Sequence, residues 1–158
     1  MKNMTEDGLF VCHSRGMNVY DDDWGPQDED WSGGGGVSKR LVERGPFLGA
    51  SLYELGPGNF VVYHAHHGSE ELLLVLRGRP TLRAPEGETQ LAPGDVASFP
   101  PGPEGAHGVR NDTDEPARFV VFGTRVSPEV VEYPDLRQVT AQSRHGLFLI
   151  HDVEEGGA

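Results

Sequence analysis

Three histidines and two glutamates fall within eight positions of the stretch YHAHHGSEELLLVLRG, residues 63–78. Imidazole nitrogens and carboxylate oxygens are common ligands of divalent transition metals. The stretch also stands directly before an apolar run, where a polar turn between two strands is expected. It is therefore either a metal site or a connection between two strands.

The spacing of His64 and His66 favours the metal site. The run NFVVYHAH predicts a strand, and side chains two residues apart on a strand share one face. Glu71 opens the next predicted strand, so it lies beside the end of the first one if the two are antiparallel. Two imidazoles with one carboxylate suit Fe, Mn, Zn, Ni or Co. His67 has the opposite parity, and we expect it at the rim or in solvent.

Short apolar runs separated by turn residues continue from residue 46 onward, about every eight to twelve positions, which predicts a β-sandwich or barrel. The runs are FLGASLYEL, NFVVYHAH, ELLLVLR, PTLRA, TQLA, DVASF, HGVRN and ARFVVFGT. An all-β fold class follows from this pattern.

One later segment, SPEVVEYP, carries helix signals instead. Ser127 is a capping residue, Pro128 fits the first helical position and Pro134 is a stop signal, so we expect one helical turn there. The runs FVCHS and LFLIH lie outside the regular pattern and predict surplus strands that extend the sheets. Because open sheet edges must be covered or paired, one of them could pair across a dimer.

Composition excludes several partner classes. The chain has 158 residues and a net charge of −12, so neither nucleic acid nor an anionic membrane is an expected partner. No apolar stretch approaches the ~20 residues of a membrane span. The only cysteine, Cys12, and the absence of a secretory signal favour a cytoplasmic location.

Three regions are expected along the chain. Residues 1–36 form an acidic, glycine-rich N-terminal extension that contains Trp24 and Trp31. This extension is either a flexible leader or a segment whose tryptophans pack onto the domain or a second subunit. Residues 37–125 form the barrel, and residues 126–158 form a C-terminal extension that packs on it.

A second group of residues completes a recognisable pattern around His107. The first set of fixed spacing is Gly58, His64, His66, Glu71 and Gly78. The second set is Gly94, Pro100, Gly102, His107 and Asn111. These sets resemble the two sequence motifs of the cupin superfamily, except that four residues rather than two separate Gly102 from His107. The resemblance covers residues 46–124, and the tail with its Tyr-Pro-Asp segment is similar to uncharacterised bacterial single-domain cupins of the cupin 2 type.

The resemblance implies a double-stranded β-helix, the cupin or jelly-roll barrel, with a metal at one mouth. It implies four metal ligands: His64, His66, Glu71 and His107. The cofactor would be one divalent transition metal, namely Fe, Mn, Zn or Ni. A homodimer is the assembly that the resemblance implies.

The expected function is that of a metal-binding cupin acting on a small-molecule ligand or substrate. Strand parity predicts a mostly apolar interior, with Asn111 near the metal. The predicted wall residues are Phe60, Val62, Leu73, Val75, Phe99 and Val109. Arg83 and Arg110 are expected near a rim, and no phosphate clamp is evident.

An apolar wall favours a dioxygenase-like metalloenzyme, because a metal that activates oxygen needs few protein groups. A non-catalytic small-molecule or metal-binding module is the alternative, and a sugar isomerase or epimerase is the third reading. No catalytic residue is identified. Tyr53, Glu54 and His67 are the available acids or bases, each with a structural role as the simpler interpretation.

Overall fold

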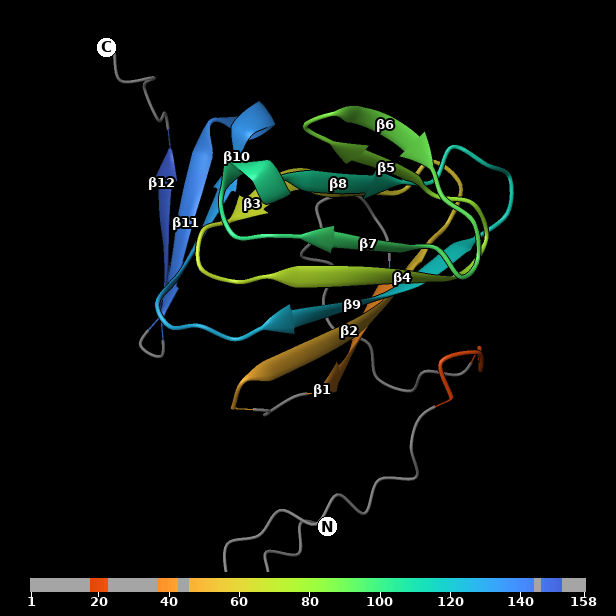
Figure 1. Cartoon of the computed structure of the whole chain (residues 1–158), viewed down its shortest axis with the longest axis horizontal. Helices are drawn as coiled ribbons and strands as arrows, with labels where there is room; N and C mark the ends of the chain where they lie inside the picture. The colour runs from red at the N-terminus through yellow and green to blue at the C-terminus, as the bar shows by residue number, and fades with distance from the viewer. Residues whose placement is uncertain (1–17, 23–36, 43–45, 144–145, 152–158) are drawn as a thin grey trace, which may run out of the picture.

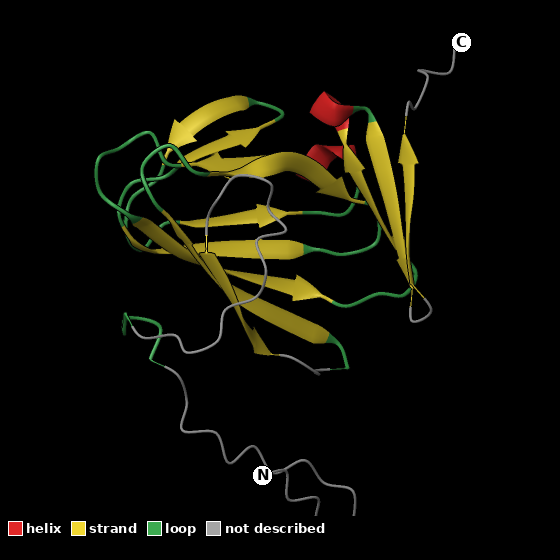
Figure 2. Cartoon of the chain, turned by 180° about the vertical axis from the view of Figure 1, so that it is seen from behind, coloured by secondary structure: helices red, strands yellow, loops and turns green. Residues whose placement is uncertain are grey.

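The computed structural model describes residues 18–22, 37–42, 46–143 and 146–151. These residues form two antiparallel sheets that face each other, with two short 3₁₀ turns beside them (Figures 1 and 2). Within them, no helix is long and apolar enough to cross a membrane. The all-β double-stranded β-helix expected from the sequence is confirmed.

The first sheet has the strand order β1-β2-β9-β4-β7. Its strands are β1 (Val37–Val42), β2 (Leu48–Leu55), β4 (Glu71–Arg77), β7 (Val96–Phe99) and β9 (Ala117–Thr124). The second sheet has the order β12-β11-β10-β3-β8-β5-β6. Its strands are β3 (Phe60–His66), β5 (Thr81–Ala84), β6 (Gly87–Gln90), β8 (His107–Arg110), β10 (Glu129–Tyr133), β11 (Gln138–Ser143) and β12 (Gly146–His151). The 3₁₀ turns are η1 (Pro103–Gly105) and η2 (Pro134–Leu136).

Strands that follow the barrel motif extend the second sheet rather than only covering it. β10 pairs with β3, β11 with β10, and β12 with β11. The surplus strand expected at LFLIH is therefore present, whereas FVCHS lies outside the described residues. In Figure 1 the three strands stand as an upright wall across one end of the barrel. The expected homodimer stays a prediction.

The helical turn expected at SPEVVEYP is wrong, because Glu129–Tyr133 is strand β10. Two adjacent valines, which are stiff and β-branched, favour extended backbone. The burial pattern also alternates, since Glu129 and Val131 are buried while their neighbours are partly exposed. Pairing with β3 and β11 satisfies the backbone groups on both sides of the strand and decides the outcome.

A closed hydrophobic core fills the space between the two sheets. Its buried members are Tyr53, Leu55, Leu73, Val75, Leu82, Leu91, Phe99, Val109 and Phe119. The rings of Tyr53 and Phe119 stack with their centroids 5.3 Å apart. Burying such apolar surface contributes about 25 cal/mol per Å² and is the main force that holds the sheets together.

Strand β3 has one residue more than β8 between two paired positions. Val61 pairs with Val109 and His64 pairs with His107, so three steps along β3 match two along β8. Such an extra residue is a β-bulge, which locally reverses which side chains face inward. Both Val61 and His64 can therefore point into the barrel.

Strand parity alone places Phe60 and Val62 in the barrel interior, and for Phe60 that prediction is wrong because of the bulge, while Val62 is half-buried and is not a member of the core. Phe60 is 43% exposed, whereas Val61 packs against the core. Beyond the bulge, His64 is buried. The remaining wall residues expected from parity are confirmed as core members: Leu73, Val75, Phe99 and Val109.

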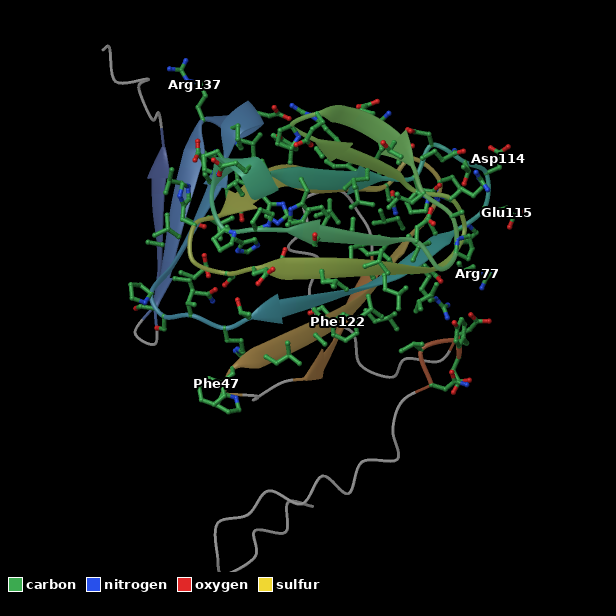
Figure 3. All side chains as sticks on the ribbon, in the orientation of Figure 1. Phe47, Arg77, Asp114, Glu115, Phe122 and Arg137 are labelled. Atoms are coloured by element: carbon green, nitrogen blue, oxygen red, sulfur yellow. The ribbon has the colours of Figure 1, made fainter. Side chains whose placement is uncertain are left out.

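Asn111 lies at the opposite end of β8 from His107, so its expected position near the metal is wrong. Asn111 is four steps along an extended chain from His107, about 13 Å. The buried Asn111 amide donates to the carbonyl oxygens of Leu55 (2.9 Å) and Glu115 (2.8 Å). Its oxygen accepts from the backbone N–H and the hydroxyl of Thr113. Glu115 lies in Figure 3 at the end of the barrel away from β10–β12.

The N-terminal segment 18–22 is fixed to the outer face of the first sheet by Arg118. This guanidinium is buried and donates to the carbonyl oxygens of Val19 and Asp21. It also binds the carboxylates of Asp22 (2.8 Å) and Glu54 (2.8 Å). Val19 packs beside Leu76 and Phe122 against Leu52 and Val120.

We expect Asn111→Ala to lower the free energy of unfolding by about 2–4 kcal/mol, because buried carbonyl groups lose their donors. Urea denaturation followed by circular dichroism measures the change. Asp114→Ala is the matched control, since this exposed side chain lies in the same loop, and it should change stability by less than about 0.5 kcal/mol. Equal midpoints for the two variants would contradict the structural role of Asn111.

Candidate metal centre

Three strands bring the candidate ligands together. His64 on β3 lies directly opposite His107 on β8, and His66 follows at the end of β3. Glu71 is the first residue of β4 and stands between Phe99 of β7 and Gly123 of β9. The site therefore lies where the two sheets meet at one end of the barrel, next to the β10–β12 wall.

The geometry of the cluster suits one metal ion. His64, His66 and Glu71 each offer one ligand atom, and these atoms all lie within 4.8 Å of one another. The Nε2 atom of His66 is 3.5 Å from Oε2 of Glu71. His107 stands outside the 4.8 Å group, yet its Nε2 atom is 3.3 Å from the same carboxylate oxygen. This donor set of imidazoles and one carboxylate fits a borderline divalent metal.

Two of the histidines have their tautomers fixed by the backbone. Nδ1 of His64 lies 2.7 Å from the carbonyl oxygen of Val62, and Nδ1 of His107 lies 2.9 Å from that of Gly105. A carbonyl oxygen only accepts, so each Nδ1 carries the proton and donates. Each Nε2 is then left as a lone pair available to a metal.

Burial keeps His64 neutral. Removal from water, together with the charges of His107 and His66, lowers the pKa of His64 to about 4. For Glu71, burial alone would raise the pKa. In the metal-free protein the close contact with His107, and the positive charge that the neighbouring imidazoles carry when protonated, outweigh burial, so the pKa of Glu71 is lowered. Near neutral pH the site thus offers a neutral imidazole and a carboxylate, the protonation states that bind metal.

The lengthened loop of the second motif does not turn His107 away. The turn η1 takes up residues between Gly102 and His107, and Gly105 packs against Pro100. A Cβ on Gly105 would lie 1.8 Å from the carbonyl oxygen of Pro100, so a side chain does not fit there. The His107 ring then stacks on Phe99 with centroids 3.7 Å apart, which joins the site to the core.

One further wall of the site comes from β10 and was not foreseen. Glu129 and Tyr133 lie on the same face of the strand, at positions four apart. Glu129 is buried, with Oε1 3.7 Å from Nδ1 of His66. The Tyr133 ring faces His64 at 6.0 Å, and burial raises the pKa of Tyr133. The available signal was the pair of β-branched valines in EVVEY, which favours a strand.

The Tyr-Pro-Asp segment has a structural role in closing this wall. Asp135, in η2, accepts two hydrogen bonds from Arg83 of β5. The Arg83 guanidinium also lies 3.9 Å from the centroid of the Tyr63 ring. These contacts hold the end of β10, and with it Tyr133, against the site.

An open cleft of about 550 Å³ reaches the site from the side. His66, Glu71 and Glu129 are among its lining residues. Its other polar lining residues include Ser51, Ser69, Thr124, Arg125, Ser127, Gln142 and Ser143. Its apolar lining residues are Pro46, Ala50, Tyr53, Val121 and Val126, so the wall is mixed rather than mostly apolar as expected.

Of the remaining candidates, only the buried Tyr53 lines the cleft with His66 and Glu71. His67 is at the rim, as expected, and its Nε2 lies 3.0 Å from Glu132. Glu54 faces the outer side of the first sheet, where it binds Arg118. Arg110 is held by Glu88 and Asp112 and offers no phosphate clamp. Cys12, Trp24 and Trp31 lie outside the described residues.

Comparison with known proteins agrees with this architecture. Residues 51–123 match the family model described as "Cupin domain". A sugar phosphate isomerase from a cupin superfamily, from Silicibacter pomeroyi, is 34% identical, with a TM-score of 0.70 over 74% of this chain and 76% of that one. A presumed sugar phosphate isomerase from Acidithiobacillus ferrooxidans is 30% identical, with a TM-score of 0.68 over 78% and 81%. TT1209 from Thermus thermophilus is 34% identical, with a TM-score of 0.50 over 55% and 82%.

No curated protein matches the chain in sequence. The identity and coverage of the solved structures, together with the family model, are sufficient for the assignment. The chain belongs to the cupin superfamily.

Acid should destabilise the metal-free protein through His64. The unfolded chain takes up a proton on this histidine below about pH 6.5, whereas the folded chain resists protonation until about pH 4. Stability is therefore lost as the pH falls through this window, by about 3 kcal/mol for His64 alone. As the pH is lowered from 6.5 to 4, the urea midpoint of the metal-stripped wild type should fall. In metal-stripped His64→Asn the midpoint should fall less over the same range. The control His67→Asn should keep the wild-type slope, and equal slopes in all three proteins would contradict the assignment.

Proposed function

We propose that this cupin is a metal-dependent isomerase that acts on a small phosphorylated sugar. The observation that carries the proposal is the polar cleft that opens onto His66 and Glu71. A hydroxylated substrate needs hydrogen-bonding partners along its length, and the serine, threonine and glutamine side chains of this cleft supply them.

The cleft also offers a positive charge for a phosphate. Arg125 follows β9 and lines the same cleft as Glu71. A guanidinium binds phosphate oxygens with two parallel hydrogen bonds, which gives orientation as well as affinity. Relatives at 30% and 34% identity named as sugar phosphate isomerases support the same substrate class.

In this proposal, His64, His66, Glu71 and His107 hold one divalent metal. The bound metal would supply Lewis-acid polarisation of the sugar carbonyl or hydroxyl. Isomerisation moves one proton between neighbouring carbons and another between their oxygens, so it balances without any co-reactant. The cleft residues bind and orient the sugar chain, and the Tyr133 ring packs against His64.

The dioxygenase-like interpretation from the sequence is less well supported, because it rested on a mostly apolar wall and the cleft lining is mixed. A binding module without catalysis remains the alternative to an enzyme. The substrate experiment below separates the three.

The four-ligand set predicts one divalent transition metal per chain. His66→Ala and His107→Ala should lower bound metal severalfold or more, while the barrel still folds, because each removes one of four donors. The control His67→Ala should retain the wild-type metal content, since its side chain faces Glu132. Elemental analysis of the purified variants gives the stoichiometry. Full metal retention in both ligand variants would overturn the ligand set.

The isomerase proposal predicts interconversion of an aldose phosphate and its ketose phosphate. Metal-stripped protein is reloaded separately with Fe(II), Mn(II), Ni(II) and Zn(II), and carbon-13 NMR follows a panel of such sugars. Arg125→Gln should raise KM for the phosphorylated sugar by about 10-fold to 100-fold, because a charge-assisted contact to phosphate is lost. Arg137→Gln is the control, since this exposed side chain points away from the barrel in Figure 3.

Oxygen consumption is measured in the same reactions. Substrate-dependent oxygen uptake with Fe(II), lost in His64→Ala, would replace the isomerase with the dioxygenase. No conversion and no oxygen uptake with any metal would leave the binding module as the function.

A further inference from the structure

Glu129 is a carboxylate buried beside the histidine cluster, on a strand outside both cupin motifs. Its side chain accepts hydrogen bonds from the backbone N–H of Gly68 (3.1 Å) and from the hydroxyl of Ser69. A buried carboxylate needs partners of this kind, because desolvation without them is costly. Its Oε1 atom, which accepts the Gly68 bond, also lies 3.7 Å from Nδ1 of His66.

His66 differs from the other two histidines of the cluster at this atom. His64 and His107 each donate from Nδ1 to a backbone carbonyl two residues away. Nδ1 of His66 is buried and makes no hydrogen bond, the one such side-chain atom among the described residues. The Glu129 carboxylate needs to approach by only about 0.7 Å to reach an ordinary N–H···O distance.

We propose that Glu129 is a positioning residue for His66. It accepts a hydrogen bond from Nδ1–H and so fixes the tautomer in which Nε2 is free toward Glu71 and the metal. A carboxylate behind a ligating histidine orients the ring and raises its basicity. This inference rests on the metal site of the proposed function and adds a residue to it from the C-terminal wall.

Strand pairing and a glycine place Glu129 where this role requires it. His66 pairs with Val131, so Glu129, two residues earlier on β10, lies beside the turn that follows β3. At that turn, a Cβ on Gly68 would lie 2.7 Å from Val126 and 3.6 Å from the Glu129 carboxylate. The bare backbone of Gly68 thus allows the close approach of β10.

The same two strands carry a matched control pair. Glu132, also on β10, binds His67, the residue next to His66, at 3.0 Å. Both side chains of this pair are more than a third exposed and face away from the cleft. Glu132→Ala therefore removes a carboxylate–histidine pair of the same type without touching the proposed ligands.

The first test is metal affinity of the full chain. Metal-stripped wild type, Glu129→Ala, Glu129→Gln and Glu132→Ala are titrated with Zn(II) in competition with a chromophoric chelator. We expect the Kd to rise 10-fold to 100-fold in Glu129→Ala. Glu129→Gln, which keeps an acceptor oxygen and nearly the same shape, should lose less. Glu132→Ala should stay within twofold of wild type.

The second test reads the His66 tautomer without any metal or substrate. Nitrogen-15 NMR of histidine-labelled protein distinguishes a protonated Nδ1 from an unprotonated one. We expect His66 to carry its proton on Nδ1 in the wild type and in Glu132→Ala. In Glu129→Ala the signal should move toward a mixture of the two tautomers. If the alanine variant does not fold, Glu129→Gln supplies the test, because its neutral amide oxygen is a weaker acceptor and should leave a smaller share of the second tautomer and a smaller rise in Kd.

The two proposals fail separately. If wild type binds no metal, the metal site itself is wrong. If wild type binds metal, but both Glu129 variants match its Kd within twofold and keep its tautomer, only the role of Glu129 is overturned.

Discussion

The bulge between Val61 and His64 is the constraint on which the rest of the site depends. A regular strand that buried Val61 would send His64 and His66 to the opposite face, because side chains alternate. The extra residue allows the same short strand to contribute first to the core and then to the ligand cluster. The pairing of β3 with β8 beyond the bulge places His107 opposite His64.

Crowding of three imidazoles creates a second constraint, which is electrostatic. Ring centroids of His64 lie 4.5 Å from His107 and 5.1 Å from His66, so positive charges on all three would repel strongly. Burial and this mutual repulsion favour a neutral His64 ring, and they outweigh the Val62 carbonyl and the negative charge of Glu71, which favour the protonated form. Gly123 leaves room for the Glu71 carboxylate beside the histidines, since a Cβ on Gly123 would lie 3.2 Å from that carboxylate.

Much of the fold and the motif residues could be predicted from the sequence. Apolar runs located the strands of the barrel, and spacing joined His64, His66 and Glu71, which the structure brings within metal-binding distance. His107 as a fourth ligand stays a prediction. The bulge could not be foreseen, because a one-residue insertion leaves no compositional mark, so Phe60 was assigned to the wrong face.

The contribution of the C-terminal strands was missed for a different reason. Pro128 and Pro134 indicate a helix only where local propensity determines the secondary structure. Here pairing with β3 determines it, and the segment is a strand. Once β10 is a strand, Glu129 and Tyr133 reach the site from a part of the chain that the motifs do not cover. The alternation of side chains along a strand cannot predict the cleft either, because the cleft depends on which loops meet at the end of the barrel.

The buried Arg118 has a consequence for how this barrel can be shortened. The domain looks complete from Val37 onward, and a boundary drawn there for crystallisation or directed evolution would seem safe. Such a cut would remove three of the oxygen acceptors around a guanidinium that cannot lose its proton. The Arg118 cation would remain on the outer face of the first sheet, which would also have lost the packing of Val19. Residues 18–22 therefore belong to the domain, although nothing in the motif pattern includes them.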